Sequence, residues 1–396
     1  MIGQGGNSAP DLGRVRRVLV VKLDEIGDFI LATPFLRGLR ASAPGATIVL
    51  AVTPLLGEMA ASCPHVDAVV AAIPSRTTDT IELKLPRPDQ PYHLERLREV
   101  MRLGGFDLAV VPRFDFDRYD GGRLARTSGA RWVFGFSETV TPLKAQRNQG
   151  FDARFYTHVL ARPATTHEVE QNLALLAHMG GHLHGGSQVE AYSTPEAEAE
   201  AERKLAAAAE RFGVGSLIAV APGSSYPAKE YPLSLLVPVV ETVARHLNAG
   251  VVVLGSAPQA PMGEALYRSM PSRCLNLCGQ LALTEAVAVI RRVRGLISMC
   301  SAPGHIAAAV GTPVAVFSCH PRDGDPEHFH APERFRPWTR DDMALMLQPA
   351  TTLGNCRGYC LAPESHCITG IDPGDAAERI SAFLPRKAYV VPPRFN

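Results

Sequence analysis

Asp28 is the first residue of the chain whose type and position point to chemistry. It follows the apolar, β-branched run at residues 18–21, which is typical of a buried strand in a parallel sheet. Gly27 is expected to relax the turn after this strand, and Asp28 to begin a helix that extends to Arg40. Because ligands bind open α/β sheets at the carboxyl ends of the strands, two interpretations of Asp28 are open. Its carboxylate either caps the helix or acts as a general base towards a ligand.

Small and hydroxyl-bearing residues follow two predicted strands in the second half of the chain, at 217–221 and 251–254. Backbone N–H groups and hydroxyls in such turns bind phosphate groups, and Lys229 adds a positive charge nearby. The alternative is a pair of ordinary surface turns with a solvated lysine. The candidate phosphate-binding residues of these turns are Gly223, Ser224, Ser225, Gly255 and Ser256.

A third strand-to-helix turn follows the predicted strand 295–299. The Ser301 hydroxyl, Ala302 and the N–H groups that enter the next helix form a second candidate anion cradle, beside Cys300. His305 lies one turn into this helix. It is either a functional group or, more commonly at such positions, a structural hydrogen-bonding residue.

Cys356, Cys360 and Cys367 have the spacing C-x3-C-x6-C near the C-terminus, and His366 precedes the last of them. Three thiolates and an imidazole can supply the four ligands of a structural zinc or iron ion. This spacing matches no standard zinc finger. The alternative is a group of thiols without a metal.

Strands and helices alternate in both halves at the spacing of doubly wound parallel sheets. A chain of 396 residues also exceeds the usual size of one hydrophobic core. We therefore predict an α/β fold with two Rossmann-like domains that face a cleft. The expected parts are residues 1–185, residues 186–345, and a Cys-containing segment at 346–396 whose helix packs back.

The composition excludes several classes of protein. Hydrophobic residues make up 46% of the chain and charged residues 20%, which is typical of a folded globular protein. A net charge of +1 gives no indication of a nucleic-acid partner. We see neither a signal peptide nor the roughly 20 apolar residues that span a bilayer. We expect a cytoplasmic protein, with peripheral contact to the inner membrane left open.

Four stretches of the chain occur in a recognisable order: VLVVKLDEIGDFILATPFLRGLR at 18–40, APGS with KEYP at 221–232, LCG at 277–279, and SAPGHIAAAVGTP at 301–313. In these stretches the chain resembles glycosyltransferase family nine, the bacterial heptosyltransferases. The similarity extends from about residue 17 to residue 320.

This resemblance implies a GT-B fold, with the acceptor mainly on the first domain and a nucleotide sugar on the second. It implies inverting transfer of a heptose or similar sugar, without a catalytic metal, to a hydroxyl of lipopolysaccharide or another cell-envelope glycan or glycolipid. By this resemblance, Asp28 is the general base and Lys229 lies near the donor phosphates. Ser224, Ser301 and His305 match positions at or beside the diphosphate.

The acceptor site is expected on the first domain. Its candidate residues are Gly27, Arg113 and Asp115. Residues 74–93, an exposed excursion, and residues 113–155, which show few periodic segments, are expected to shape it. Arginines in the second stretch either meet an anionic acceptor or form a solvated face.

Cys300 departs from the family pattern, which has an aspartate at this position, and Ala302 replaces a glycine. A thiol cannot accept the sugar's hydroxyl hydrogens as a carboxylate does, so the usual donor, ADP-heptose, is not assured. The C-terminal cysteines are also similar to cysteine pairs in family members that bind iron. Two other functions stay open: a sugar-nucleotide epimerase or hydrolase, which converts donor without an acceptor, and a non-catalytic nucleotide-sugar-binding protein.

Overall fold

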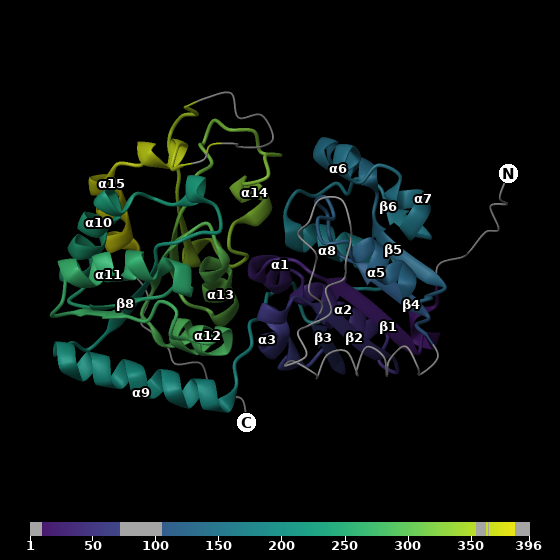
Figure 1. Cartoon of the computed structure of the whole chain (residues 1–396), viewed down its shortest axis with the longest axis horizontal. Helices are drawn as coiled ribbons and strands as arrows, with labels where there is room; N and C mark the ends of the chain where they lie inside the picture. The colour runs from purple at the N-terminus through teal and green to yellow at the C-terminus, as the bar shows by residue number, and fades with distance from the viewer. Residues whose placement is uncertain (1–9, 72–104, 354–361, 363, 385–396) are drawn as a thin grey trace. The chain divides into compact units, whose positions relative to one another are not determined.

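The computed structural model describes residues 10–71, 105–353, 362 and 364–384. The chain divides into two compact units, Met1–Ser187 and Gln188–Asn396. Each unit contains a six-stranded parallel sheet with helices on both faces (Figure 1). This confirms the prediction of two doubly wound α/β domains.

The sheet of the first unit has the strand order β3-β2-β1-β4-β5-β6. Its strands are β1 (Arg17–Lys22), β2 (Thr47–Val52), β3 (Ala68–Ala71), β4 (Leu108–Val111), β5 (Trp132–Phe136) and β6 (His158–Leu160). Its α-helices are α1 (Ile26–Leu31), α2 (Thr33–Ser42), α3 (Gly57–Ala61), α5 (Gly121–Thr127), α6 (Pro142–Arg147), α7 (Phe151–Phe155) and α8 (Glu168–His178). Short 3-10 helices are η1 (Leu12–Arg14), η2 (Pro54–Leu56) and η3 (Glu138–Val140).

Strand β1 lies in the middle of this sheet, and its residues are buried on both faces. Leu19 and Val21 pack in the same core cluster as Leu124 and Ala125 of α5, whereas α1, α2 and α8 contact one another. The chain leaves β1 in one direction, to β2 and β3, and returns to β4 on the other side. The carboxyl ends of β1 and β4 therefore form the topological switch point, where ligands bind sheets of this kind.

The predicted continuous helix from Asp28 to Arg40 is wrong, because the structure divides it into α1 and α2. Pro34 lacks the N–H that would bond the Ile30 carbonyl oxygen, and its ring crowds the preceding turn. The Thr33 hydroxyl donates to that oxygen instead, at 2.7 Å.

Residues 113–155 also differ from the expected loop. They contain α5, β5, η3, α6 and α7, which are too short for strong periodicity. The expected excursion at 74–93 lies outside the described residues.

The sheet of the second unit has the order β12-β11-β10-β7-β8-β9. Its strands are β7 (Leu217–Ala221), β8 (Gly250–Val253), β9 (Cys274–Asn276), β10 (Leu296–Met299), β11 (Val314–Phe317) and β12 (Ala344–Leu347). Its α-helices are α9 (Pro195–Phe212), α10 (Leu233–His246), α11 (Ala260–Ser269), α12 (Leu283–Arg292), α13 (Ala302–Val310), α14 (Pro332–Phe335) and α15 (Pro373–Phe383). Short 3-10 helices are η4 (Pro227–Lys229), η5 (Ala257–Gln259), η6 (Asp341–Met343) and η7 (Cys367–Gly370).

Helices α10, α11 and α15 share one core cluster with the sheet of the second unit. Helix α15 packs against α10, to which it lies adjacent in Figure 1. Tyr231 connects the segment before α15 to the sheet. Its hydroxyl donates to the Ile371 carbonyl oxygen at 2.7 Å, and its ring stacks on Phe317 of β11. In this sheet the direction of winding reverses between β7 and β10, which places a second switch point there.

Candidate active site

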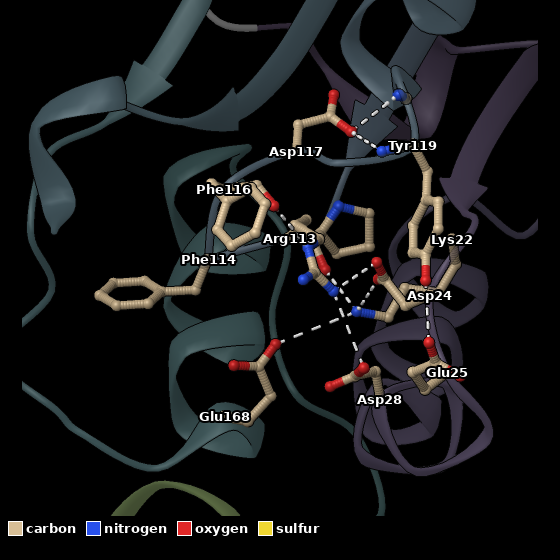
Figure 2. A network of polar contacts seen from close by, with 12 residues as sticks. Lys22, Asp24, Glu25, Asp28, Arg113, Phe114, Phe116, Asp117, Tyr119 and Glu168 are labelled. Atoms are coloured by element: carbon tan, nitrogen blue, oxygen red, sulfur yellow. Dashed lines mark hydrogen bonds and ion pairs between the residues drawn. The ribbon is translucent and has the colours of Figure 1, made fainter. Parts of the chain in front are cut away.

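Asp28 lies in the first turn of α1, just beyond the carboxyl end of β1 (Figure 2). The helix begins at Ile26 and Glu25 occupies the N-cap position, so the interpretation of Asp28 as an N-cap is wrong. Gly27 is the second residue of α1 and its φ is outside the left-handed region, so its expected role in the turn is also wrong. The chain turns earlier than predicted, which leaves the Asp28 carboxylate for other interactions.

Arg113 brings the ends of β1 and β4 together. Its Nη1 lies 2.5 Å from Asp24 Oδ1 and 3.7 Å from Asp28 Oδ2, so one guanidinium bridges two carboxylates (Figure 2). Its Nε donates to the Phe116 carbonyl oxygen at 3.1 Å. The structure therefore places the predicted residues Asp28 and Arg113 in one site.

Lys22, the last residue of β1, supports this site from below the surface. It is 1% exposed, donates to the Pro112 carbonyl oxygen at 2.7 Å and pairs with Asp24 Oδ2 at 2.8 Å. Glu168, the first residue of α8, lies 4.0 Å away. Burial opposes the ammonium charge, but the surrounding carboxylates raise the pKa of Lys22 above its ordinary value, so the lysine stays charged.

The two aspartates of the site differ in their proton affinity. Burial raises the pKa of Asp28 above its ordinary value, and Arg113 only partly offsets this because the Asp24 charge adds to the rise. Burial also acts on Asp24, but Arg113 and Lys22 outweigh it and hold the pKa of Asp24 below its ordinary value. Such separation is typical of acid–base sites, in which one group stays ionised and the other exchanges a proton.

Asp115, a predicted acceptor contact, lies in the same region, where it is 7% exposed and its charge acts on Arg113 and Asp28. Lys144 of α6 donates to the carbonyl oxygens of Arg113 and Phe114, at 3.0 and 3.2 Å. Burial lowers the pKa of Lys144 to about 8.

Sequence reasoning missed four charged residues of this network: Lys22, Asp24, Lys144 and Glu168. A lysine at the end of an apolar strand was a usable signal for Lys22, because buried lysines need partners. Lys144 had no comparable signal, since it reaches the site only through the fold of residues 113–155.

The second unit places the predicted phosphate-binding residues around the β7–β10 switch point. The Ser301 hydroxyl donates to the Gly223 carbonyl oxygen at 3.4 Å and lies 3.3 Å from the Met299 carbonyl oxygen. Ser301 occupies the N-cap position of α13. Among its described contacts, however, the hydroxyl bonds to these carbonyl oxygens and not to a backbone N–H of the helix. Pro303 has no N–H and the Gly304 N–H donates to the Ser301 carbonyl oxygen at 3.1 Å, so in the first turn of α13 the candidate donor to an anion is the Ala302 N–H.

Gln259 joins the turns after β7 and β8, and sequence reasoning missed it. Its Oε1 accepts hydrogen bonds from the Ser256 backbone N–H and hydroxyl, at 2.9 and 3.3 Å. A Cβ added at Gly223 would lie 2.1 Å from Gln259 Nε2, and one at Gly255 would lie 2.8 Å from its Oε1. A side chain at either glycine would therefore force Gln259 to move from its present position.

The loop after β7 carries the remaining donor candidates. The Ser224 N–H donates to Glu230 Oε1 at 2.9 Å, and Ser225 is exposed. Lys229 ends η4, and its Nζ lies 5.5 Å from the centre of the Tyr226 ring, at cation–π distance.

The turn after β10 contains three further candidates. Cys300 is 9% exposed, and its backbone N–H donates to the Phe317 carbonyl oxygen of β11 at 3.0 Å. Ala302 begins α13, and His305, 7% exposed, lies in the helix's first turns. All three lie at the same edge of the sheet as Gly223.

Three buried histidines, His320, His328 and His330, follow β11 and were not singled out from the sequence. The ring centres lie 5.2 Å apart for His320 and His328, and 5.6 Å apart for His328 and His330. The His330 ring lies 5.8 Å from that of Tyr226, beside Lys229. Burial lowers the pKa of His328 to about 4 and that of His330 well below its ordinary value, so both are neutral near pH 7. The spacing H-x7-H-x-H was the available signal.

Of the predicted metal ligands, Cys356 and Cys360 lie outside the described residues. Cys367 is buried; its sulfur accepts from the Leu353 N–H at 3.4 Å and lies 3.4 Å from His366 Nδ1. Among residues 10–71, 105–353, 362 and 364–384, no group of three or more His, Cys, Asp or Glu is arranged to hold a metal ion. Of the helices that the structure describes, none has the length and apolar character needed to cross a membrane.

Comparison with known proteins finds relatives among heptosyltransferases. The chain is 31% identical to the lipooligosaccharide heptosyltransferase 2 of Haemophilus influenzae over 125 residues, which are 30% of this chain and only 36% of that protein. It is 25% identical to the lipopolysaccharide heptosyltransferase 3 of Escherichia coli over 325 residues, 80% of this chain and 83% of that one.

Solved structures show the same architecture. A glycosyltransferase family 9 protein from Veillonella parvula aligns with a TM-score of 0.71 at 20% identity, over 96% of this chain and 99% of that one. The heptosyltransferase WaaC of E. coli, solved with ADP, aligns with a TM-score of 0.65 at 15% identity, over 92% and 99% of the two chains. The shared fold is GT-B, as the resemblance implied.

The family model for glycosyltransferase family 9 (heptosyltransferase) matches residues 134–355, which are more than half of the chain. The match includes the β7 and β10 turns and confirms the family expected from the four stretches. Asp28 lies before the matched region, so its assignment rests on the opening stretch and on the geometry of the first unit. The protein belongs to glycosyltransferase family 9, the heptosyltransferases.

Proposed function

We propose that this protein transfers a heptose or similar sugar, with inversion, from a nucleotide-diphosphate donor to a hydroxyl of a cell-envelope glycan or glycolipid. The observation that carries the proposal is the placement of Asp28. It lies at the β1–β4 switch point with its side chain 18% exposed, and its environment raises its pKa above the ordinary value. A carboxylate with these properties suits general-base catalysis in a chain of this family.

In the proposed reaction Asp28 removes the proton of the acceptor hydroxyl while the hydroxyl oxygen attacks the anomeric carbon of the donor sugar. The bond from that carbon to the diphosphate oxygen breaks, and the nucleoside diphosphate leaves with the bonding electrons. Attack on the face opposite the leaving group inverts the anomeric centre. The base and the neutralising charge both come from side chains, so no step of this scheme is assigned to a metal.

The leaving diphosphate is assigned to the second unit. Its charge would be met by Lys229, by the Ala302 N–H that begins α13 and by the turns at Gly223 and Ser256. ADP-heptose is the proposed donor, supported by the family and by WaaC solved with ADP. Lipopolysaccharide core is the proposed acceptor, supported by the names of the two relatives.

Two further parts of the proposal rest on the sequence alone. We place the enzyme in the cytoplasm, with peripheral contact to the inner membrane left open. A structural zinc or iron ion is assigned to Cys356, Cys360 and Cys367, and elemental analysis of the purified protein tests it: less than about 0.1 metal ion per chain removes it.

The main experiment is a transfer assay with ADP-heptose and heptose-deficient lipopolysaccharide. Asp28→Asn should abolish transfer while calorimetric affinity for the donor stays within about twofold of wild type. The matched control is Asp11→Asn, an exposed aspartate near the start of the first unit, which should keep full activity. Wild-type turnover in Asp28→Asn would remove Asp28 as the base.

The same assay separates the alternative functions. Donor conversion at equal rates with and without acceptor would indicate an epimerase or hydrolase. Donor binding with no conversion under any condition would indicate a non-catalytic member of the family.

A further inference from the structure

We infer that Arg113 is a positioning residue for the Asp28 carboxylate, and that Lys22 and Asp24 form the support that holds Arg113 in place. The inference rests on the proposed function of Asp28 as the base. The sequence predicted that Arg113 contacts the acceptor. We infer instead that it contributes to the reaction by orienting the Asp28 carboxylate.

The support is a closed chain of contacts between two neighbouring strands (Figure 2). Lys22 ends β1 and binds the carbonyl oxygen of Pro112, which follows β4. The same ammonium pairs with Asp24, and Asp24 pairs with Arg113, the residue after Pro112. Because each link is short and buried, the guanidinium has little freedom to move.

Arg113 is held at further points that leave Nη1 directed at the two aspartates. Its Nε is occupied by the Phe116 carbonyl oxygen, and its own carbonyl oxygen accepts from Lys144. Nη1 touches Asp24 closely, at 2.5 Å, and Asp28 more loosely, at 3.7 Å. The tight contact fixes the arginine, and the loose one leaves the Asp28 carboxylate able to take up a proton.

The exposure of the Asp24, Arg113 and Asp28 side chains increases in that order. The Asp24 side chain is 3% exposed, that of Arg113 is 11% exposed and that of Asp28 is 18% exposed. An acceptor therefore meets Asp28 more readily than Arg113. Without Arg113 the two carboxylates would face each other across the site and repel.

The charged groups around Asp28 come from three elements. Lys22 ends β1 and Asp24 follows it, Arg113 and Asp115 follow β4, and Glu168, whose charge acts on Lys22 and Arg113, begins α8. Arg113 and Lys22 favour the ionised form of Asp28, whereas Asp24 and Asp115 favour the protonated form. Loss of Arg113 and loss of the Asp24 charge should therefore change the pH dependence of transfer in opposite directions.

The test measures kcat/KM for transfer against pH. In Arg113→Gln the acidic limb of the profile should move to higher pH by about 1 unit, so that activity below the limb falls about tenfold. In Asp24→Asn the limb should move to lower pH. Arg113→Lys keeps the charge without the planar fork, so its limb should lie between those of wild type and Arg113→Gln, with a reduced kcat.

Arg14→Gln is the matched control, because the Arg14 side chain is 88% exposed and pairs with Asp11 away from the site. Thermal melts and donor calorimetry establish that each variant is folded. If Asp24→Asn does not fold, the comparison of Arg113→Gln with Arg113→Lys still tests the limb.

An unchanged acidic limb in folded Arg113 variants overturns the inference. A raised acceptor KM with an unmoved limb also overturns it, and returns Arg113 to direct acceptor binding. Wild-type activity of Asp28→Asn would instead overturn the proposed function, so the two failures are distinguishable.

Discussion

The Ser301 hydroxyl donates a hydrogen bond to the Gly223 carbonyl oxygen, 3.4 Å away, and so joins the turns that follow β10 and β7. The first unit has a matching device, in which Lys22 Nζ binds the Pro112 carbonyl oxygen and joins the ends of β1 and β4. In each sheet, a side chain just after or at the end of one strand donates a hydrogen bond to a backbone carbonyl oxygen that follows the neighbouring strand. Both hydrogen bonds lie at the switch point of their sheet. Such cross-links fix the backbone where a ligand must be held, because both strands then move together.

Gly223→Ala should weaken donor binding. The added Cβ would lie 2.1 Å from Gln259 Nε2, so the glutamine must leave Ser256 and disturb the turn after β8. We expect about a tenfold loss of ADP-heptose affinity by calorimetry. The double variant Gly223→Ala/Gln259→Ala removes the collision and should recover part of this loss.

The control for this pair is Gly215→Ala, also in the second unit. A Cβ at Gly215 meets no described atom within 4 Å, and its φ lies outside the left-handed region. Equal affinities of Gly223→Ala and Gly215→Ala would show that the Gly223 turn does not contact the donor.

Lys229→Ala should lower affinity for the donor by about 10- to 100-fold, the usual effect of removing a charged contact to a phosphate. The loss should fall when the ligand is the nucleoside monophosphate, because Lys229 is assigned to the diphosphate. Lys204→Ala is the matched control, since Lys204 pairs with Glu200 on α9. Unchanged diphosphate affinity in the Lys229 variant would contradict the assignment.

Much of the scaffold was predictable from local patterns. The apolar run at residues 18–21 indicated a central strand because both of its faces are buried, and the cap formed by Thr194 with Pro195 is present at the start of α9. Pro34 also marked the break between α1 and α2, but the regular apolar spacing on both sides of it concealed the signal.

The partners of the site residues were less predictable. Asp28 and Ser301 were placed from their positions after strands, whereas Gln259 and Lys144 reach their sites only through tertiary packing. No spacing in the sequence connects Arg113 to Asp24, because the contact arises from the pairing of β1 with β4. The sequence therefore indicated at which edge of each sheet the site residues lie. It did not indicate which side chains would bond to them there.

Thr33→Val should destabilise the first unit by about 1 kcal/mol, because the Ile30 carbonyl oxygen would lose the hydroxyl that replaces the missing Pro34 N–H. The substitution keeps the side-chain volume, so packing changes little. Urea denaturation measures the effect. Thr47→Val, at the exposed start of β2, is the control and should change stability by less than about 0.5 kcal/mol. Equal stabilities of the two variants would contradict this account.

His328→Asn should reduce the acid sensitivity of the second unit. Burial lowers the pKa of His328 to about 4 in the folded protein, against 6.5 for an ordinary histidine. Between these values the unfolded chain binds the extra proton, so the folded state loses stability as the pH falls from 6.5 to 4. A shift of this size corresponds to at most about 3 kcal/mol.

The asparagine oxygen can still accept the hydrogen bond that His328 Nδ1 takes from the His330 N–H, at 3.0 Å, but it takes up no proton in this range. Urea denaturation at several pH values should therefore give a flatter stability curve between pH 6.5 and 4 for His328→Asn than for wild type. His246→Asn, on the exposed side of α10, should keep the wild-type slope. If His328→Asn also keeps that slope, the buried imidazole is not a source of the acid sensitivity, and His330 becomes the next residue to test.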